Sequence, residues 1–290
     1  MEGIYDYIKA LALKSETVNG PKEGDYKGKD GLWRCGVCHA LKQTSLDCGG
    51  ETLHPFVPCD CKKRAEKMVE DQNLANMAAD DLQKRREDCF PATAKGCPMI
   101  SMTFENSNGT NVKPMSIANR YCNAFDLMLE KGEGLLLWGL RGTGKTYIAG
   151  CIANSLLNAG KKVKFVQMPT IIRAAQVGEF VPEDYNKYHL IIIDDLGVER
   201  QTDFAQEVLW SMIEERVKNQ LPMVITTNIS LDEIKRRSGL TESTEKKCSC
   251  FDRALSKILE ACTPIEINET NERRNKIWEK QQFVKETLGI

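Results

Sequence analysis

The sequence lacks any apolar run that approaches the ~20 residues of a membrane-spanning helix. It also lacks an excess of charge, because 40 basic residues oppose 41 acidic residues and leave a net charge of −1. That balance excludes a histone-like protein that binds nucleic acids through bulk positive charge. No basic segment precedes the first apolar residues, so a secretory signal is not expected. We therefore expect a cytoplasmic protein without a membrane segment.

The rest of the composition is that of a globular protein, with 41% hydrophobic and 28% charged residues. The length of 290 residues suits one large domain or two modest ones. The unusual feature is cysteine, which occurs 12 times, with a cluster between Cys35 and Cys61. In a long chain without a secretory signal, such a cluster favours a metal site over a disulfide framework.

Composition and periodicity divide the chain into three parts. Residues 1–88 hold the cysteine cluster and then an amphipathic helix, predicted from Cys61 to Asp88 by apolar residues three and four positions apart. Residues 89–113 are rich in Pro, Gly, Asn, Ser and Thr, which is typical of a linker. Residues 114–290 alternate helices with short apolar strands.

The third part is predicted to be an α/β domain. Its strands are continuous apolar runs, which is typical of a parallel sheet covered by helices on both faces. The predicted strands are residues 135–138, 164–167, 190–193 and 223–226, and the predicted helices are residues 116–129, 145–158 and 204–218.

A glycine-rich segment follows the first of these strands. Its sequence from Gly139 to Thr146, GLRGTGKT, fits the phosphate-loop pattern G-x-x-x-x-G-K-[ST]. Glycines let backbone N–H groups converge on phosphate oxygens, and the N-terminus of the next helix adds partial positive charge. Lys145 can reach the β- and γ-phosphates, and the Thr146 hydroxyl can ligate Mg²⁺. We predict that ATP is held by Gly139, Arg141, Gly142, Thr143, Gly144, Lys145, Thr146 and Tyr147.

Acidic residues follow the third predicted strand. Asp194 and Asp195 end the run LIIIDD, at the sheet edge where open α/β sheets bind ligands. We expect Asp194 to hold Mg²⁺ through water and Asp195 to polarise the attacking water, which makes hydrolysis as well as binding plausible. Asn228, at the tip of the next strand, could hydrogen-bond the γ-phosphate or the lytic water, or could simply end the strand in a turn.

Together these segments resemble a known family. The phosphate loop, IIIDDLG, ITTNISLDEI and FDRALSKILEACTPIEI look like the AAA+ ATPases of the DnaC/DnaI helicase-loader group and their transposition relatives of the IstB type. The resemblance covers roughly residues 100 to 275, and TFEN at residues 103–106 resembles the motif near their adenine pocket. It implies an AAA+ three-layer αβα fold that binds ATP between subunits of an oligomer.

The resemblance assigns Arg253 as the arginine finger, which reaches the γ-phosphate held by a neighbouring subunit. The sequence departs from the family here, because Ser249-Cys250 occupies the place where loaders usually show a further arginine. Arg253 also has a simpler interpretation, a surface ion pair with Asp252 or Glu260.

Two further residues match sensor positions of the family. Asn228 corresponds to sensor 1, and Arg273 corresponds to the sensor-2 arginine that follows the last strand. The tyrosine expected just before the sensor-2 arginine is Glu272, so Arg274 is an alternative to Arg273.

The cysteine cluster contains two close pairs about 20 residues apart, Cys35-x2-Cys38 and Cys59-x-Cys61. Four thiolates give tetrahedral Zn²⁺, and a site with no open position is structural. A small module has too little apolar surface to fold alone, so the metal would supply its folding energy. Competing ligands are Cys48, His39 and His54. Loaders of this family often carry such a module, which implies that it docks on the replicative helicase.

The leading hypothesis is an ATP-dependent loader that binds the hexameric replicative helicase and places it on single-stranded DNA. By resemblance, the DNA would contact the segment 168–188, where Tyr185 or Tyr188 could stack on bases. The alternative is a transposition helper ATPase that acts on duplex DNA with a transposase. A third class is a nucleotide-dependent adaptor with negligible turnover, against which Asp195 and Arg253 argue.

Overall fold

The computed structural model divides the chain into two compact units, Met1–Asp80 and Asp81–Ile290, which are described separately. The division falls inside helix α2 (Asp60–Cys89). Among the helices that the structure describes, none is long and apolar enough to cross a membrane. The residues that the structure describes are 2–48, 50–90, 98–107, 109–197, 202–239, 249–268, 282–285 and 287.

The N-terminal unit consists of one helix, two small antiparallel hairpins and the first turns of α2. Its elements are α1 (Glu2–Asn19), β1 (Tyr26–Lys27) paired with β2 (Trp33–Arg34), and β3 (Leu46–Cys48) paired with β4 (Glu51–Leu53). Of its described apolar side chains, the buried ones are Cys35, Cys48, Phe56 and Cys59. A unit with so small an apolar core needs a further source of stability, such as a metal ion.

A buried ion pair holds the loop that carries the first two cysteines of the cluster. Lys42 Nζ lies 2.5 Å from Asp25 Oδ2 and donates to the Gly20 carbonyl at 2.7 Å. The other Asp25 oxygen accepts from the Gly36 N–H at 2.9 Å, between Cys35 and Cys38. The hydrogen bond from Lys42 lowers the pKa of Asp25 to about 2, so the carboxylate stays charged at neutral pH.

The C-terminal unit is built on a five-stranded parallel sheet in the order β6-β7-β8-β5-β9. Its strands are β5 (Gly134–Trp138), β6 (Val163–Gln167), β7 (Leu190–Leu196), β8 (Met223–Thr227) and β9 (Cys262–Glu266). The interior strands are almost wholly buried, as expected when helices cover both faces. The predicted α/β fold with a parallel sheet is therefore confirmed.

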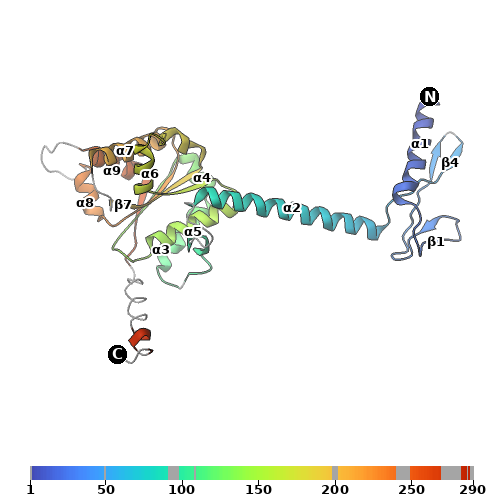
Figure 1. Ribbon diagram of the computed structural model, residues 1–290, viewed down its shortest axis with the longest axis horizontal. Helices are drawn as coiled ribbons and strands as arrows, with labels where there is room; N and C mark the ends of the chain where they lie inside the picture. The colour runs from blue at the N-terminus through green and yellow to red at the C-terminus, as the bar shows by residue number, and fades with distance from the viewer. Residues whose placement is uncertain are drawn as a thin grey trace. The chain divides into compact units, whose positions relative to one another are not determined.

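Helices pack on both faces of this sheet (Figure 1). Alternate residues of a strand enter opposite cores, so Leu135 and Leu137 face one cluster and Leu136 the other. The first cluster lies under α3 (Val112–Asn123), α4 (Phe125–Lys131) and α5 (Lys145–Asn158). The second lies under α6 (Met168–Gln176), α7 (Asp203–Lys218), α8 (Leu231–Arg237) and α9 (Cys250–Ala261).

The helix predicted at residues 116–129 is two helices. It begins four residues earlier, at Val112, and is interrupted at Ala124, where α3 ends and α4 starts. Tyr121 and Phe125 pack edge to face across this junction with ring centroids 5.9 Å apart. The apolar period continues through the break, and this is why the sequence predicts one helix.

Described residues on both sides of the segment 91–97 pack in the core of the C-terminal unit. Cys89 and Phe90 are buried in its first cluster, and Met99 and Met102 pack against the same cluster. Met99 belongs to a short 3-10 helix, η1 (Pro98–Ser101), and Met102 directly follows this helix. The described part of the predicted linker is thus attached to the core of this unit.

The fully buried Arg216 of α7 hydrogen-bonds the backbone just before the amino ends of β7 and β8, whereas the phosphate loop follows the carboxyl end of β5. Its guanidinium donates to the carbonyl oxygens of Tyr185, Tyr188 and Pro222 at 3.1, 2.9 and 2.7 Å. It also donates to the His189 carbonyl at 3.4 Å. One side chain therefore satisfies four backbone acceptors around the segment that leads into β7.

Arg216→Met should lower the free energy of unfolding of the C-terminal unit by about 3 kcal/mol or more, because buried carbonyls lose their donor. Urea denaturation followed by circular dichroism measures the change. Lys218→Met, on the exposed part of the same helix, is the matched control and should change stability by less than about 0.5 kcal/mol. An equally small effect of Arg216→Met would contradict this account.

Candidate functional site

The loop between β5 and α5 has the backbone that a phosphate loop requires. Gly139, Gly142 and Gly144 have φ values of 148°, 83° and 99°, which disfavour any residue with a Cβ. A Cβ on Gly139 would lie 2.2 Å from the Ile267 carbonyl oxygen. The loop ends where α5 begins at Lys145, so the N-terminus of a 14-residue helix points at the predicted phosphate position.

Lys145 is buried, with 5% of its surface exposed, and its ammonium group contacts the loop itself. Nζ donates to the carbonyl oxygens of Gly139 at 2.9 Å and Leu140 at 2.6 Å. A bound phosphate would therefore exchange these carbonyl acceptors for its own oxygens. The next residue, Thr146, donates through its hydroxyl to Asp194 Oδ1 at 3.0 Å.

The two acids at the end of β7 lie in different environments. Asp194 is 3% exposed and accepts hydrogen bonds from Thr146 and Thr226, whereas Asp195 is exposed to solvent. Burial raises the pKa of Asp194 above its ordinary value because it disfavours the charged form. A cation beside the carboxylate would stabilise that charged form. The hydroxyl of Thr146 and the carboxylate of Asp194 are hard oxygen ligands of the kind that Mg²⁺ prefers.

The TFEN segment lies beside α5, close to the phosphate loop. Tyr147 donates its hydroxyl to the Thr103 carbonyl at 3.0 Å. Asn154, buried on the apolar face of α5, donates to the carbonyls of Met99 and Met102 at 2.7 and 2.9 Å. The segment that resembles an adenine-pocket motif is therefore fixed to the helix that begins at Lys145.

Two asparagines in this region were not predicted from the sequence. Asn154 interrupts an otherwise apolar face of α5, and this irregularity is a signal that could have been used. Asn111 is 3% exposed, has φ of 54° and donates through Nδ2 to the Thr143 carbonyl at 2.7 Å. No sequence pattern marks Asn111, because its role depends on a backbone conformation and a contact 32 positions away.

The predicted sensor and finger residues come from separate elements. Asn228 directly follows β8 and is half-buried at the same sheet edge as the phosphate loop. Arg253 is exposed on α9, stacks on the Trp210 ring with its guanidinium carbon 5.0 Å from the centroid, and donates to Cys250 Sγ at 3.0 Å. Arg273 and its alternative Arg274 lie outside the described residues.

The two acids proposed as ion-pair partners of Arg253, Asp252 and Glu260, each pair with another cation. Asp252 pairs with Arg237 at 3.1 Å, and Glu260 pairs with Lys257 at 2.9 Å. Asp252 also completes a capping box with Ser249 at the start of α9. Ser249 is thus the N-cap of α9, in the neighbourhood where the resemblance to loaders leads one to expect a further arginine.

The segment expected to contact DNA contains α6 and the 3-10 helix η2 (Pro182–Lys187). Tyr188 is 4% exposed, and its hydroxyl donates to Asp88 Oδ1 at 2.9 Å. Its ring therefore belongs to the packing between α2 and the sheet and is not available to stack on a base. Tyr185 is half-buried beside Phe180, with ring centroids 5.9 Å apart.

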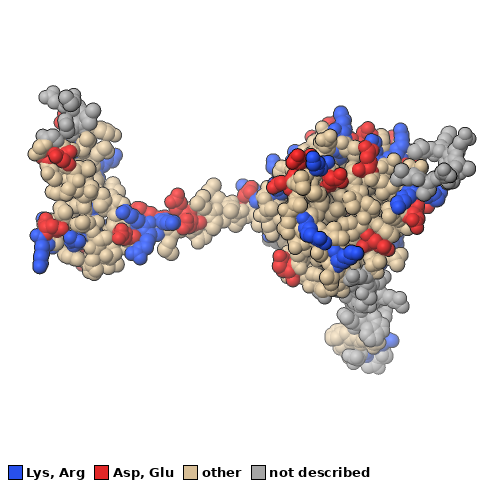
Figure 2. Space-filling view, turned by 180° about the vertical axis from the view of Figure 1, so that it is seen from behind, with Lys and Arg blue, Asp and Glu red and all other residues tan. Residues whose placement is uncertain are grey.

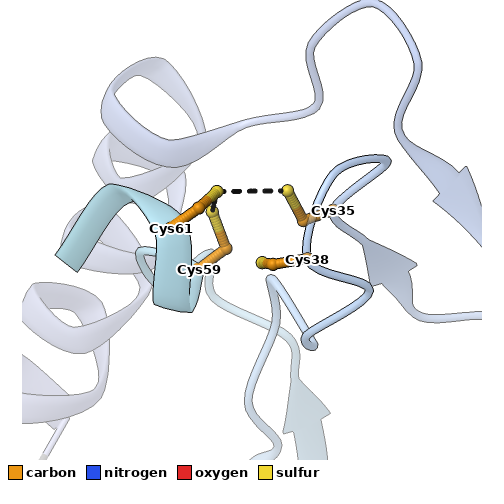
Figure 3. A group of neighbouring side chains, drawn as sticks. All are labelled: Cys35, Cys38, Cys59 and Cys61. Atoms are coloured by element: carbon orange, nitrogen blue, oxygen red, sulfur yellow. Dashed lines mark hydrogen bonds between the residues drawn. The ribbon is translucent and has the colours of Figure 1, made fainter. Parts of the chain in front are cut away.

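The four predicted thiols meet in the N-terminal unit. Their sulfur atoms all lie within 4.8 Å of one another (Figure 3). Cys61 lies in the first turn of α2 and Cys59 directly precedes that helix, whereas Cys35 and Cys38 come from the loop after β2. Tetrahedral Zn²⁺ at ~2.3 Å from each sulfur needs sulfurs about 3.8 Å apart, which this group can adopt with small shifts.

The surroundings of the group favour thiolates. Backbone N–H groups of Ala40 and Cys61 lower the pKa of the Cys38 thiol to about 6. The Cys61 thiol has the opposite shift, to about 12, because it shares hydrogen bonds with Cys59, Cys35 and Cys38. The Cys38 sulfur is therefore charged near neutral pH, while Cys61 holds a proton that a metal ion would displace.

The competing ligands have other contacts. His39 Nδ1 lies 3.1 Å from the Tyr26 hydroxyl, and His54 Nδ1 lies 3.2 Å from the Ser45 hydroxyl. Cys48 ends β3 at the turn to β4. Among the described residues, the group of close metal-binding side chains consists of the four cysteines alone.

Comparison with known proteins gives a family match and several relatives. The family model for IstB-like ATP binding proteins matches residues 104–276. The chain is 29% identical over 202 residues to the replicative helicase loader DnaI of Bacillus subtilis, covering 67% of this chain and 65% of that protein. It is 25% identical over 133 residues to the replicative helicase loader DnaC of Escherichia coli, covering 43% and 53% respectively.

A third relative comes from a mobile element. The chain is 29% identical over 119 residues to a protein of Sinorhizobium fredii described as an insertion sequence ATP-binding protein, covering 39% of this chain and 40% of that protein. The chain thus spans less than two thirds of the length of each of these relatives. The family match covers more than half of the chain and agrees with the phosphate loop and the parallel sheet. The chain therefore belongs to the family of IstB-like ATP binding proteins.

Proposed function

We propose that the protein is an ATPase in which Lys145 and the loop Gly139–Thr146 hold the phosphates of ATP. Thr146 and Asp194 would hold Mg²⁺, which neutralises phosphate charge when bound. Asp195, which is exposed one residue further along β7, would orient the attacking water. Asn228 would contact the γ-phosphate or that water, and Tyr147 and Thr143 complete the binding loop.

We propose further that ATP binds between subunits and that Arg253 completes the site of a neighbour. Its guanidinium is exposed and is supported by the Trp210 ring, so it can extend from α9 toward a second chain. Arg273 is the proposed sensor-2 arginine. This arrangement would make hydrolysis depend on self-association.

We propose that the whole protein loads a replicative DNA helicase onto single-stranded DNA in the cytoplasm. The observation that carries this proposal is the pairing of a nucleotide site with a separate unit that contains four clustered thiols. The alignment with the loader DnaI also supports it, because its 202 residues extend beyond the family match at 104–276. The N-terminal domain predicted from the sequence, residues 1–88, would contact the helicase, followed by a connector at 89–113 and the ATPase domain at 114–290.

The distribution of charge on the surface is consistent with a protein that contacts DNA through a small area. Acidic and basic side chains are intermingled over the visible face of the C-terminal unit (Figure 2). Bulk attraction of a polyanion is therefore weak, as the net charge of −1 also indicates. DNA contact would depend on an assembled oligomer.

The alternative is a transposition helper that binds duplex DNA and a transposase. The match to the insertion sequence ATP-binding protein supports it. That match covers 39% of the chain, and the thiol group adds a feature that the ATPase unit alone does not require.

Lys145→Ala should weaken ATP binding at least tenfold and abolish turnover, because a hydrogen-bonded charge contributes about 1.5–3 kcal/mol. Binding of a fluorescent ATP analogue and phosphate release measure the two effects. Lys131→Ala, on an exposed residue at the end of α4, is the control and should leave both unchanged. Normal turnover by Lys145→Ala would refute the assignment of the nucleotide site.

The double variant Cys59→Ser, Cys61→Ser should lose zinc and unfold the N-terminal unit, because serine is a poor zinc ligand and the metal supplies folding energy. Metal analysis of the purified full-length protein and limited proteolysis measure the two effects. Cys48→Ser should keep its zinc, since Cys48 is outside the thiol group. Loss of zinc from Cys48→Ser would show that the ligand set is wrong.

The full-length protein should bind the purified replicative helicase of the same organism, and the Cys59→Ser, Cys61→Ser variant should bind it less. Size-exclusion chromatography with ATP present measures complex formation. The transposase encoded nearest to the gene is the comparison partner, tested with single-stranded and with duplex DNA. Binding to the transposase and not to the helicase would establish the alternative.

A further inference from the structure

The end of β7 has an irregular backbone at the two acids. The pairing of β7 with β8 shifts in register between Ile193 and Leu196. Asp195, between them, has φ of 56°, a left-handed conformation that is uncommon for a residue with a side chain. Asp194 is buried while Asp195 is exposed. Something must stabilise this conformation, because it costs on the order of 1–3 kcal/mol.

The side chain of Thr226 on β8 contacts both acids. Its Oγ1 accepts from the Asp195 backbone N–H at 2.8 Å and lies 2.7 Å from Asp194 Oδ1. A hydroxyl has one hydrogen and two acceptor positions. The Asp195 N–H can only donate, so Oγ1 is the acceptor there, and its single hydrogen is directed to the Asp194 carboxylate.

The sheet order explains why this contact is possible. β8 lies between β5, which leads into the phosphate loop, and β7, which carries the acids. Thr226 is fully buried one residue before the end of β8. Asp194 Oδ1 therefore accepts from both Thr146, which follows the phosphate loop, and Thr226 on β8. Two donors fix the direction of its carboxylate.

We propose that Thr226 is a positioning residue of the nucleotide site, whose hydroxyl aims the Asp194 carboxylate and holds the Asp195 backbone in its left-handed conformation. The proposal rests on the proposed ATPase function. It assigns to Thr226 a role that the neighbouring Thr227 does not share. The Thr227 hydroxyl donates to the Leu196 carbonyl at 2.9 Å and accepts from the Ile229 N–H at 3.1 Å, and neither partner is an acid.

A role that is merely structural would affect folding alone, and the chain offers a matched control. Thr226 and Thr227 are both fully buried on β8, and each hydroxyl makes two hydrogen bonds. Thr226→Val and Thr227→Val are therefore the same chemical change at adjacent positions. Thr226→Ser keeps the hydroxyl and removes the methyl group.

The experiment compares these variants in the full-length protein by three measurements. Hydrogen–deuterium exchange of the segment 190–197 is measured without nucleotide. Affinity for a non-hydrolysable ATP analogue is measured with Mg²⁺ and with EDTA, and kcat and KM are measured for ATP. Thr226→Val should expose the Asp195 amide to exchange and reduce the gain in affinity that Mg²⁺ provides. Its kcat should fall about tenfold or more, because a hydrogen bond to a charged group is lost.

Thr226→Ser should behave like the unmodified protein in all three measurements, and Thr227→Val should keep the Mg²⁺-dependent gain in affinity. If Thr226→Val retains normal exchange and normal Mg²⁺ dependence, the proposal is overturned. It is also overturned if affinity falls equally with Mg²⁺ and with EDTA. If Thr226→Val does not fold, Thr226→Ala is compared with Thr226→Ser, since the two differ in the hydroxyl alone.

The proposed ATPase function can fail independently of this inference. If the unmodified protein binds ATP but does not hydrolyse it, the proposed function is wrong in its catalytic part. The exchange of the Asp195 amide and the Mg²⁺-dependent affinity then still decide whether Thr226 positions the two acids.

Discussion

The hydrogen bond from Thr146 to Asp194 joins two segments that are 48 positions apart in the sequence. It exists because all five strands are parallel, so that their carboxyl ends meet at one edge. β8 separates the strand of the phosphate loop from the strand of the acids, and its Thr226 contacts both acids. The site is thus a consequence of strand order: exchanging β7 and β8 would place the acids beside β5 and change the distance from Asp194 to Thr146.

The second constraint is that the Lys145 charge is buried and must always have an acceptor. In the structure the carbonyls of Gly139 and Leu140 fill that role. Phosphate oxygens are stronger acceptors because they carry charge, so in the proposed ATP complex they would replace these neutral partners with ionised ones. Position 139 requires glycine, because its φ is 148° and a Cβ there would lie 2.2 Å from the Ile267 carbonyl oxygen.

The sequence was sufficient for features that depend on local pattern. The bounds of α5, residues 145–158, agree with the prediction because glycine ends the loop, lysine starts the helix and the apolar spacing is regular. β9 was not assigned a range from pattern, since its alternation is weak and it contains Pro264, which is tolerated because β9 pairs on one side only. Long-range contacts were also missed. Thr226 looks like an ordinary β-branched strand residue, and only the fold shows that it contacts two acids.

The two units differ in what stabilises them, and this follows from their residues. The C-terminal unit buries two extended apolar clusters on the two faces of one sheet, so its stability comes from apolar burial. In the N-terminal unit, three of the four buried apolar residues are cysteines, two of which belong to the thiol group. Removing Cys35 or Cys59 would therefore remove part of the core as well as a proposed metal ligand. Metal binding by the four thiols would be coupled to the folding of that unit. A protein that must present a small binding surface can use this arrangement, because four thiols around one metal ion would join the loop after β2 to the start of α2, which an apolar core of that size could not hold alone.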